Sequence, residues 1–313
     1  MSLQAPSAVV MVRPHRFAPN AETAADNVFQ TDAAAGASSR AVARAAHDEV
    51  TAVAAALTAE GVEVHLFEDR GACTPDSVFP NNWFSTHPGG HIALYPMYTP
   101  NRRLERRTDV VELLKRCYRV QDVIDYSGLE QDGLFLEGTG AMVLDHLDRI
   151  AYVARSRRAD PLILERFCTN FGYEPMAFEA ADPSGTAVYH TNVLMTVATS
   201  FALVGLGAIT DPVRRDEIVE RLASSGRDVI ELDVAQLFDF AGNTLELTGR
   251  DGPLLAMSRR AHTALSDDQV ARIERSARIV SVPLPTIELA GGSMRCMLAG
   301  IHLARRAVTG VAA

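Results

Sequence analysis

The fold is decided by five similar segments: NWFSTHPGGHIALYPM (82–97), EGTGAMVLDHLDRIAYVARS (137–156), HTNVLMTVATSFALVGLGA (190–208), NTLELTGRDGPLLAMS (243–258) and CMLAGIHLA (296–304). Each opens on a polar or reactive residue and continues into apolar stretches typical of a β-hairpin. The opening residues are Asn82, Glu137, His190, Asn243 and Cys296, and they are separated by 55, 53, 53 and 53 positions. Similarity at a fixed period is typical of repeat architectures.

A helix and a short strand follow each hairpin in the predicted unit. The pairs Asp160-Pro161 and Asp211-Pro212 place a capping residue before a proline at the first helical position. Each expected helix is followed by a short strand, so that the unit has the order strand, strand, helix, strand. Helices are expected over 39–61, 103–118, 160–172, 211–226 and 258–277.

The last unit lacks the second strand of its hairpin, whereas the N-terminus supplies a spare strand at 8–14. Pairing the last strand with the first closes the ring and removes two free sheet edges. We therefore predict an α/β fold, a five-fold pseudosymmetric α/β propeller of ββαβ units, with residues 1–313 as a single catalytic domain. The alternative is an ordinary α/β sheet with loops of similar length. A dinucleotide-binding fold is disfavoured, because GLGAIT (205–210) lacks the third glycine of that motif.

Composition narrows the class of protein. The 313 residues are 47% hydrophobic with a net charge of −9, which excludes disorder as the main state and disfavours a nucleic-acid partner. The four cysteines form no close pair, no apolar run is long enough to span a membrane, and no signal peptide is evident. We expect a cytoplasmic protein without a membrane partner that acts on a small molecule. The sequence leaves the oligomeric state open, a homo-oligomer included.

In a closed ring the five repeated positions converge on one end of the axis. Cys296, His190 and Glu137 would then form a nucleophile, an acid/base group and an orienting or substrate-holding carboxylate. Arg295 and the glycine turn before Cys296 are expected to favour the thiolate. We interpret Asn243 as a strand terminator, and the other cysteines as small core residues: Cys73, Cys117 and Cys168.

Six stretches carry a resemblance to a known group of proteins: MVRPHRFAPNAETAADNVFQ (11–30), PDSVFPNNWFS (75–85), LEGTGAMVLD (136–145), YHTNVLM (189–195), GNTLEL (242–247) and GGSMRCML (291–298). They resemble the guanidine-modifying, or pentein, superfamily over essentially the whole chain. Within it the chain looks closest to the bacterial citrulline-utilisation hydrolases, an amidinotransferase-like branch. The resemblance implies that Cys296 is the nucleophile, His190 the catalytic histidine and Glu137 its carboxylate partner. It also implies a covalent thiol adduct, with no metal and no organic cofactor.

The departures from the superfamily pattern bear on the substrate. Relatives that bind a cationic guanidinium often carry aspartates where this chain has Asn82 and Asn192. An amide suits a neutral ureido group, whose carbonyl needs a donor, so we expect citrulline to be converted to ornithine. Asp76 could instead hold a cationic group. The loop that carries Asn27, Arg13 and His15 could meet the substrate carboxylate, and the charged run 102–107 is expected to be a solvated face.

Other functions of the superfamily remain open at this stage. The enzyme alternatives are dimethylarginine dimethylaminohydrolase, arginine deiminase or dihydrolase, and amidinotransferase. The non-enzyme alternative is a ribosome-associated binding factor with the same ring, which the cysteine, histidine and glutamate at ring positions disfavour.

Overall fold

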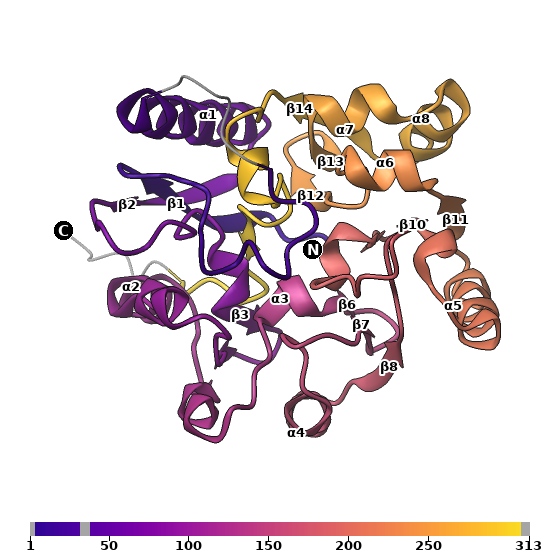
Figure 1. Cartoon of the computed structure of the whole chain (residues 1–313), viewed down its shortest axis with the longest axis horizontal. Helices are drawn as coiled ribbons and strands as arrows, with labels where there is room; N and C mark the ends of the chain where they lie inside the picture. Colours follow the sequence, from indigo (N-terminus) through magenta and orange to yellow (C-terminus); the bar gives the residue numbers. More distant parts are fainter. Residues whose placement is uncertain (1–3, 32–37, 308–313) are drawn as a thin grey trace.

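Five three-stranded sheets surround a central axis (Figure 1). The structure, a computed structural model, describes residues 4–31 and 38–307. In each sheet the inner strand pairs antiparallel with the middle strand, which pairs parallel with the outer one. From inner to outer, the sheets contain β3 (Phe84–His87), β4 (His91–Leu94) and β5 (Asp122–Asp125); β6 (Val143–Asp145), β7 (Ile150–Ala154) and β8 (Glu174–Phe178); β9 (Met195–Val197), β10 (Phe201–Val204) and β11 (Asp228–Glu231); β12 (Leu245–Gly249), β13 (Gly252–Ser258) and β14 (Arg278–Val282); and β15 (Ala299–Gly300), β1 (Ala8–Pro14) and β2 (Glu63–Asp69).

The two ends of the chain close the ring in the predicted way. Near the C-terminus, β15 pairs antiparallel with β1, with Val9 opposite Gly300 and Val10 opposite Ala299. The same β1 pairs parallel with β2 along its whole length. The fifth sheet is thus assembled from both ends of the sequence, and the predicted five-fold α/β ring is confirmed.

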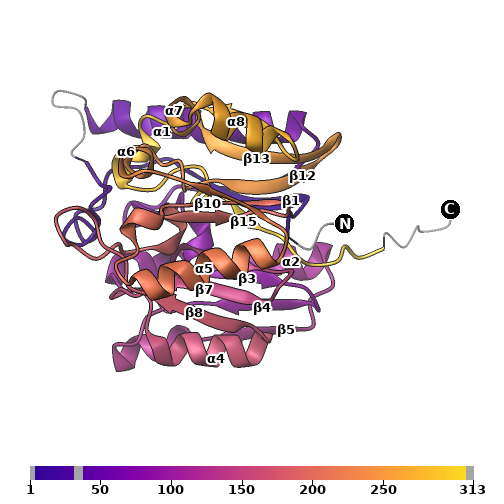
Figure 2. The same ribbon diagram turned by 90° about the vertical axis from the view of Figure 1, so that its right-hand side faces the viewer.

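The helices lie on the outside of the ring and connect middle strands to outer strands (Figures 1 and 2). Asp160 and Asp211 cap two of them by accepting from backbone N–H groups of the first turn. Two expected helices are broken in the structure: 103–118 is a 3-10 helix (Pro100–Glu105) followed by α2, and 258–277 is interrupted at Leu265. The connecting helices are α1 (Ser39–Ala59), α2 (Thr108–Cys117), α4 (Pro161–Phe171), α5 (Pro212–Ser224), α7 (Arg259–Ala264) and α8 (Asp267–Glu274). Two short helices were not predicted: α3 (Gly138–Ala141) and α6 (Val234–Phe238).

The longest helix shows how the outer layer is attached. α1 buries one stripe of apolar side chains against the sheet of β1: Val42, Ala46, Val50, Val53 and Leu57. Their spacing of three and four residues places them on a single helical face. Among the described residues, no helix has both the length and the apolar character that a membrane crossing requires.

The cysteines outside the repeat differ in their burial, although all are free thiols. Cys168 lies in an apolar core cluster, as predicted, and burial raises the pKa of its thiol to about 12. Cys117 is partly buried, whereas Cys73 is exposed. The interpretation of Cys73 as a core residue is therefore wrong.

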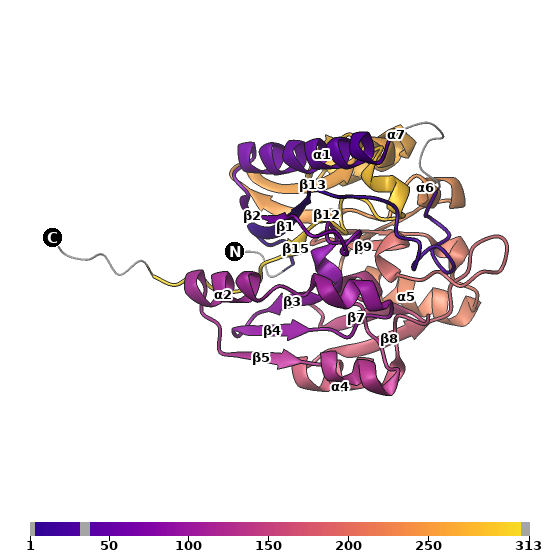
Figure 3. The same ribbon diagram turned by 60° about the vertical axis from the view of Figure 1, so that its left-hand side comes forward.

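The direction of the strands decides which loops reach the site. Inner strands start just after the repeated site residues and run away from them, and the antiparallel middle strands return, as β3 and β4 show (Figure 3). The segments that follow middle strands therefore come back to the end of the ring where the site residues lie.

Candidate active site

A narrow cavity of about 10 Å³ lies at the end of the ring where the site residues converge. Five of the predicted residues line it, namely Cys296, His190, Asn82, Asp76 and Asn27. Three further side chains reach these residues from behind: Glu137 contacts His190, and Asn192 and Asn243 contact the sulfur of Cys296. Residues from all five units thus meet at one place, as the ring closure requires.

The sulfur of Cys296 is surrounded by amide groups. Asn192 and Asn243 each donate from Nδ2 to the Sγ atom at 3.2 Å, and Asn243 Oδ1 accepts from the Cys296 backbone N–H at 3.3 Å. Two N–H donors directed at sulfur stabilise a negative charge there better than a neutral thiol. Asn243 is therefore a site residue, and its interpretation as a mere strand terminator is wrong.

His190 and Glu137 form a buried pair. The ring nitrogen Nε2 lies 2.8 Å from a carboxylate oxygen of Glu137, and both side chains are buried. Since an ionised carboxylate can only accept, Nε2 carries the proton and Nδ1 keeps its lone pair. Burial lowers the pKa of His190 to about 4, although the hydrogen bond to Glu137 opposes this shift. The free site therefore contains a neutral imidazole.

Gly140 makes room for this arrangement. A Cβ atom at this position would lie 2.1 Å from Asn82 Nδ2 and 2.9 Å from Nδ1 of His190. Any side chain would therefore displace one of these groups. The glycine belongs to the EGTG segment of α3, so this part of the repeat is explained by close packing inside the site.

Two arginines keep Glu137 ionised. Arg102 Nη1 and Arg158 Nη1 lie 3.4 and 3.5 Å from its carboxylate oxygen. Burial alone would raise the pKa of Glu137, but the charge of Arg158, the hydrogen bond from His190 and the charge of Arg102 hold it well below its usual range. Arg158 also pairs with Asp26, which lies in the loop after β1.

The charged run 102–107 was predicted to face solvent, but two of its side chains are buried. Arg102 is 2% exposed and Glu105 is 3% exposed, and the two side chains form an ion pair at 3.0 Å. Burial raises the pKa of Glu105 to about 8, against the opposing charge of Arg102. The prediction missed Arg102 and Arg158 as site residues. Both follow middle strands, β4 and β7, so strand direction is the signal that could have found them.

Asn82 has one amide atom engaged and one available. Its Oδ1 accepts from Arg102 Nη2 at 3.0 Å, and since arginine has only donors, this contact fixes the orientation of the amide. Its Nδ2 is buried without a hydrogen-bond partner among the described residues. Asp76 instead accepts from Asn20 Nδ2 at 2.8 Å and lies 3.6 Å from Arg102. Burial raises the pKa of Asp76, while the charge of Arg102 opposes this.

Asn27 and Arg13 were both predicted to line the site, but only Asn27 does so. Asn27 packs against Gly291, whose φ of 78° favours glycine, and donates to the carbonyl of Ala290. Arg13 lies in β1 and pairs with Glu68 on the neighbouring strand, which also contacts His15. Neither Arg13 nor His15 lines this cavity, so the prediction of a substrate contact at Arg13 is wrong in its geometry.

The comparison with known families now decides the relationship. A sequence model of the family described as "N,N dimethylarginine dimethylhydrolase, eukaryotic" matches residues 13–303. The chain belongs to this family. It is therefore a member of the pentein guanidine-modifying superfamily, as the motifs predicted. A search of curated proteins returned no match.

This chain has the same fold as several solved structures of the superfamily. The substrate-bound N-terminal domain of ArgZ, an arginine dihydrolase from cyanobacteria, has a TM-score of 0.71 at 17% identity over 94% of this chain and 97% of that domain. AgrE with L-arginine gives 0.74 at 18% identity over 96% of this chain, which corresponds to only 41% of the AgrE chain. A dimethylarginine dimethylaminohydrolase adduct with S-methyl-L-thiocitrulline gives 0.62 at 13% identity, covering 96% of this chain and all of the other.

Proposed function

We propose that the chain, acting as one catalytic domain, hydrolyses the ureido C–N bond of citrulline to form ornithine. One observation carries the choice of substrate: the side chains in direct contact with the Cys296 sulfur are amides. Next to them, Asn82 offers an unpaired buried N–H. A ureido oxygen accepts from such a donor, whereas a guanidinium has only N–H groups to offer and would leave the site donors unpaired.

The first step needs a nucleophile and a base. Neutral His190 takes the proton of the Cys296 thiol at Nδ1, and the amide groups of Asn192 and Asn243 stabilise the thiolate. The sulfur attacks the ureido carbon, and Asn82 Nδ2 donates to the oxygen as it gains negative charge. The bond from this carbon to the ornithine nitrogen breaks as His190 returns its proton to that nitrogen.

The second step releases the carbamoyl group from sulfur. Water attacks the carbamoyl carbon while His190 accepts its proton, and the carbon–sulfur bond breaks to restore the Cys296 thiol after proton return. The released carbamate decomposes to carbon dioxide and ammonia. Glu137 holds His190 in one tautomer through both steps, because its ionised carboxylate accepts from Nε2. The reaction as written uses protein groups and water alone.

The second candidate is hydrolysis of arginine or of a methylated arginine. The family match and the arginine-bound structural relatives favour a guanidino substrate. Asp76 supports it within this chain, because it is a carboxylate in the cavity lining. Its Oδ2 atom contacts Asn20 and Arg102, whereas its Oδ1 atom is buried without a hydrogen-bond partner among the described residues and could accept from a guanidinium N–H.

A product assay distinguishes the candidates. The purified enzyme is incubated separately with citrulline, arginine and dimethylarginine, and ornithine, citrulline, urea and ammonia are quantified. Our proposal predicts ornithine and ammonia from citrulline. Citrulline as the end product from arginine or dimethylarginine, with no ornithine from citrulline, would contradict it. No turnover of all three substrates would instead favour a binding function.

A further inference from the structure

A second cavity lies on the ring axis and is lined by all five inner strands. It is a small cavity of about 40 Å³, and its lining includes residues of β3, β6, β9, β12 and β15. These strands start next to the catalytic cavity and run away from it, so this axial cavity lies deeper along the axis. None of its lining residues is among those that line the catalytic cavity.

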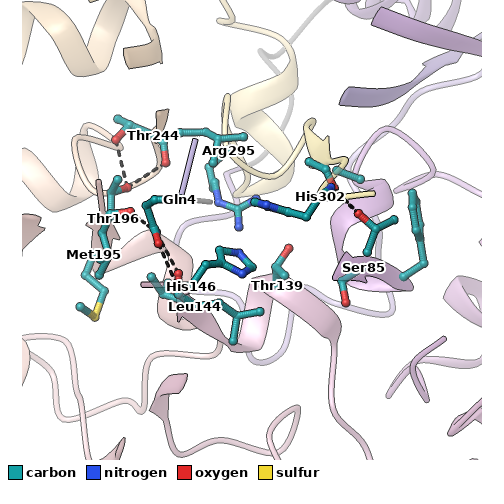
Figure 4. A pocket seen from close by; sticks show the side chains of 17 residues that line it. Gln4, Ser85, Thr139, Leu144, His146, Met195, Thr196, Thr244, Arg295 and His302 are labelled. Atoms are coloured by element: carbon teal, nitrogen blue, oxygen red, sulfur yellow. Dashed lines mark hydrogen bonds between the residues drawn. The ribbon is translucent and has the colours of Figure 1, made fainter. Parts of the chain in front are cut away.

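The ionisable side chains that face the axial cavity include an arginine and two histidines. Arg295, His146 and His302 point toward one another at its centre (Figure 4). The lining contains no aspartate and no glutamate among the described residues. The Arg295 side chain makes one hydrogen bond in the described part of the chain, from Nη1 to the Leu298 carbonyl at 3.2 Å. It forms no ion pair with any described residue. A guanidinium with five N–H donors is therefore left largely unpaired.

Other polar side chains in the lining are already engaged. The Gln4 side chain donates to the carbonyls of Leu144 and Val197 and accepts from the backbone N–H of His146. Thr196 donates to the carbonyl of Gly242 or Thr244. These contacts connect neighbouring inner strands, so the Gln4 and Thr196 side chains form part of the cavity wall. Arg295 faces the interior of the cavity together with the ring of His146, which also contacts the Tyr173 hydroxyl.

The positive charge of Arg295 is costly without a partner. Burial lowers the pKa of Arg295 to about 10, and the charge of Cys296 opposes this shift only in part. Burial also lowers the pKa of His146 well below its usual range, with contributions from His302, His87, Arg149 and Arg295. Charges that are withdrawn from water are normally paired, and among the described residues the lining offers no carboxylate to the partly buried Arg295.

We propose that the axial cavity binds a small inorganic anion of the size of chloride, bicarbonate or phosphate. In this proposal Arg295 and His146 Nε2 both donate to the anion. His146 Nδ1 lies 2.8 Å from the Tyr173 hydroxyl, which in the proposed state donates to Nδ1 and leaves the ring proton on Nε2. The anion replaces the missing carboxylate as the counter-charge of Arg295. The site is independent of the substrate proposed above, because it shares no lining residue with the catalytic cavity.

The position of Arg295 gives this site a link to the nucleophile. Arg295 and Cys296 are consecutive, and both are held by Asn243, which accepts from the Arg295 backbone N–H at 3.2 Å and donates to the Cys296 sulfur. Their side chains enter different cavities. A bound anion therefore fixes the segment that carries the nucleophile from its opposite side.

The first test measures anion binding by the full chain. The melting temperature is followed while chloride, bicarbonate or phosphate replaces a bulky organic sulfonate at constant ionic strength. We expect a saturable rise of several degrees in at least one small anion, because a ligand that binds only the folded state stabilises it. Arg295→Met should abolish this rise, whereas Arg166→Met, which removes the same charge from the exposed face of α4, should retain it.

The second test locates the anion. Crystals of the wild-type protein are soaked in bromide, and anomalous scattering is measured. A bromide peak within hydrogen-bonding distance of the Arg295 guanidinium is expected. Bromide at surface positions only, or melting temperatures that depend on ionic strength alone, would overturn the proposal. If Arg295→Met does not fold, the wild-type titration and the bromide map still decide.

Discussion

Arg102 and Arg158 at the catalytic end of the ring lie among carboxylates, whereas Arg295 in the axial cavity has none. The catalytic pair contacts four acidic side chains: Glu105, Asp76, Glu137 and Asp26. The one hydrogen bond of the Arg295 side chain in the described part of the chain goes to a backbone carbonyl. The two regions share the axis and the five inner strands. The arginines of the first region have carboxylate partners, whereas the Arg295 side chain has none among the described residues.

The difference separates a preformed network from an open binding site. Around Glu137 each charge has a partner, so His190 is held in one tautomer before the substrate arrives. Removing one member of such a network leaves its partners buried and unpaired, which is costly. In the axial cavity the partner is missing from the protein itself, so removal of Arg295 should cost little.

The largest effect is expected at the sulfur. Cys296→Ser should lower kcat/KM for the substrate by roughly 10³-fold or more, because a serine hydroxyl is a far weaker nucleophile without its own base system. Steady-state kinetics measure this, with unchanged circular dichroism as the folding control. Cys73→Ser, at an exposed cysteine, should retain wild-type activity. Residual turnover near the wild-type rate in Cys296→Ser would refute the mechanism.

The next effect concerns the charge network. Glu137→Gln should destabilise the protein by about 3 kcal/mol, because it leaves Arg102 and Arg158 without one of their buried partners. Arg295→Met, measured in the bulky sulfonate, should change stability by less than about 1 kcal/mol. Urea unfolding of both variants checks this. Equal destabilisation by the two substitutions would remove the distinction between the two ends of the ring.

Substrate preference gives a smaller effect. Asn82→Asp should lower kcat/KM for citrulline and raise it for arginine, each by roughly tenfold, because it replaces an N–H donor by a charged acceptor. Asn82→Ala serves as the control, since it removes the donor without adding a charge. It should lower citrulline turnover and leave arginine turnover no higher. A variant Asn82→Asp with the wild-type preference would show that Asn82 does not select the substrate.

The smallest effect is a pH dependence of stability. Burial lowers the pKa of His146 in the folded state, so the unfolded chain binds the proton first as the pH falls. The wild type should therefore lose stability as the pH falls below about 6.5, because His146 is then protonated in the unfolded chain before it is protonated in the folded one. The stability difference between the wild type and His146→Gln should shrink as the pH falls from 6.5 to 4.5. A stability difference between the two proteins that stays constant with pH would show that the pKa of His146 is not lowered in the folded state.

The sequence predicted the ring because the period and the spare strand are both visible in it. It also predicted Cys296, His190, Glu137 and Asn82 at one end of the axis, since repeated positions in a ring converge. It missed Arg102 and Arg158, because a charged run such as 102–107 resembles a solvated surface until the strand directions are known. It misplaced Arg13, whose partner Glu68 lies on a strand more than 50 residues away.

The contact of Asn243 with sulfur was also beyond the sequence. Its side chain bonds both to Sγ and to the backbone of Cys296, and only the folded turn brings these atoms together. The same turn sends the Arg295 side chain into the axial cavity, where its charge still interacts with that of Cys296, as adjacency in sequence suggested. Two consecutive residues can thus line separate cavities, because their side chains point in different directions.

The measurement that tests the central claim most directly is the trapping of the covalent intermediate. Wild-type enzyme is mixed with citrulline labelled with carbon-13 in its ureido group, quenched in acid at successive times, and digested for peptide mass spectrometry. We predict a labelled carbamoyl group on the peptide that contains Cys296, which appears and decays as ornithine forms. Formation of ornithine with the label on another residue, or with no label on Cys296 at any time, would contradict the account.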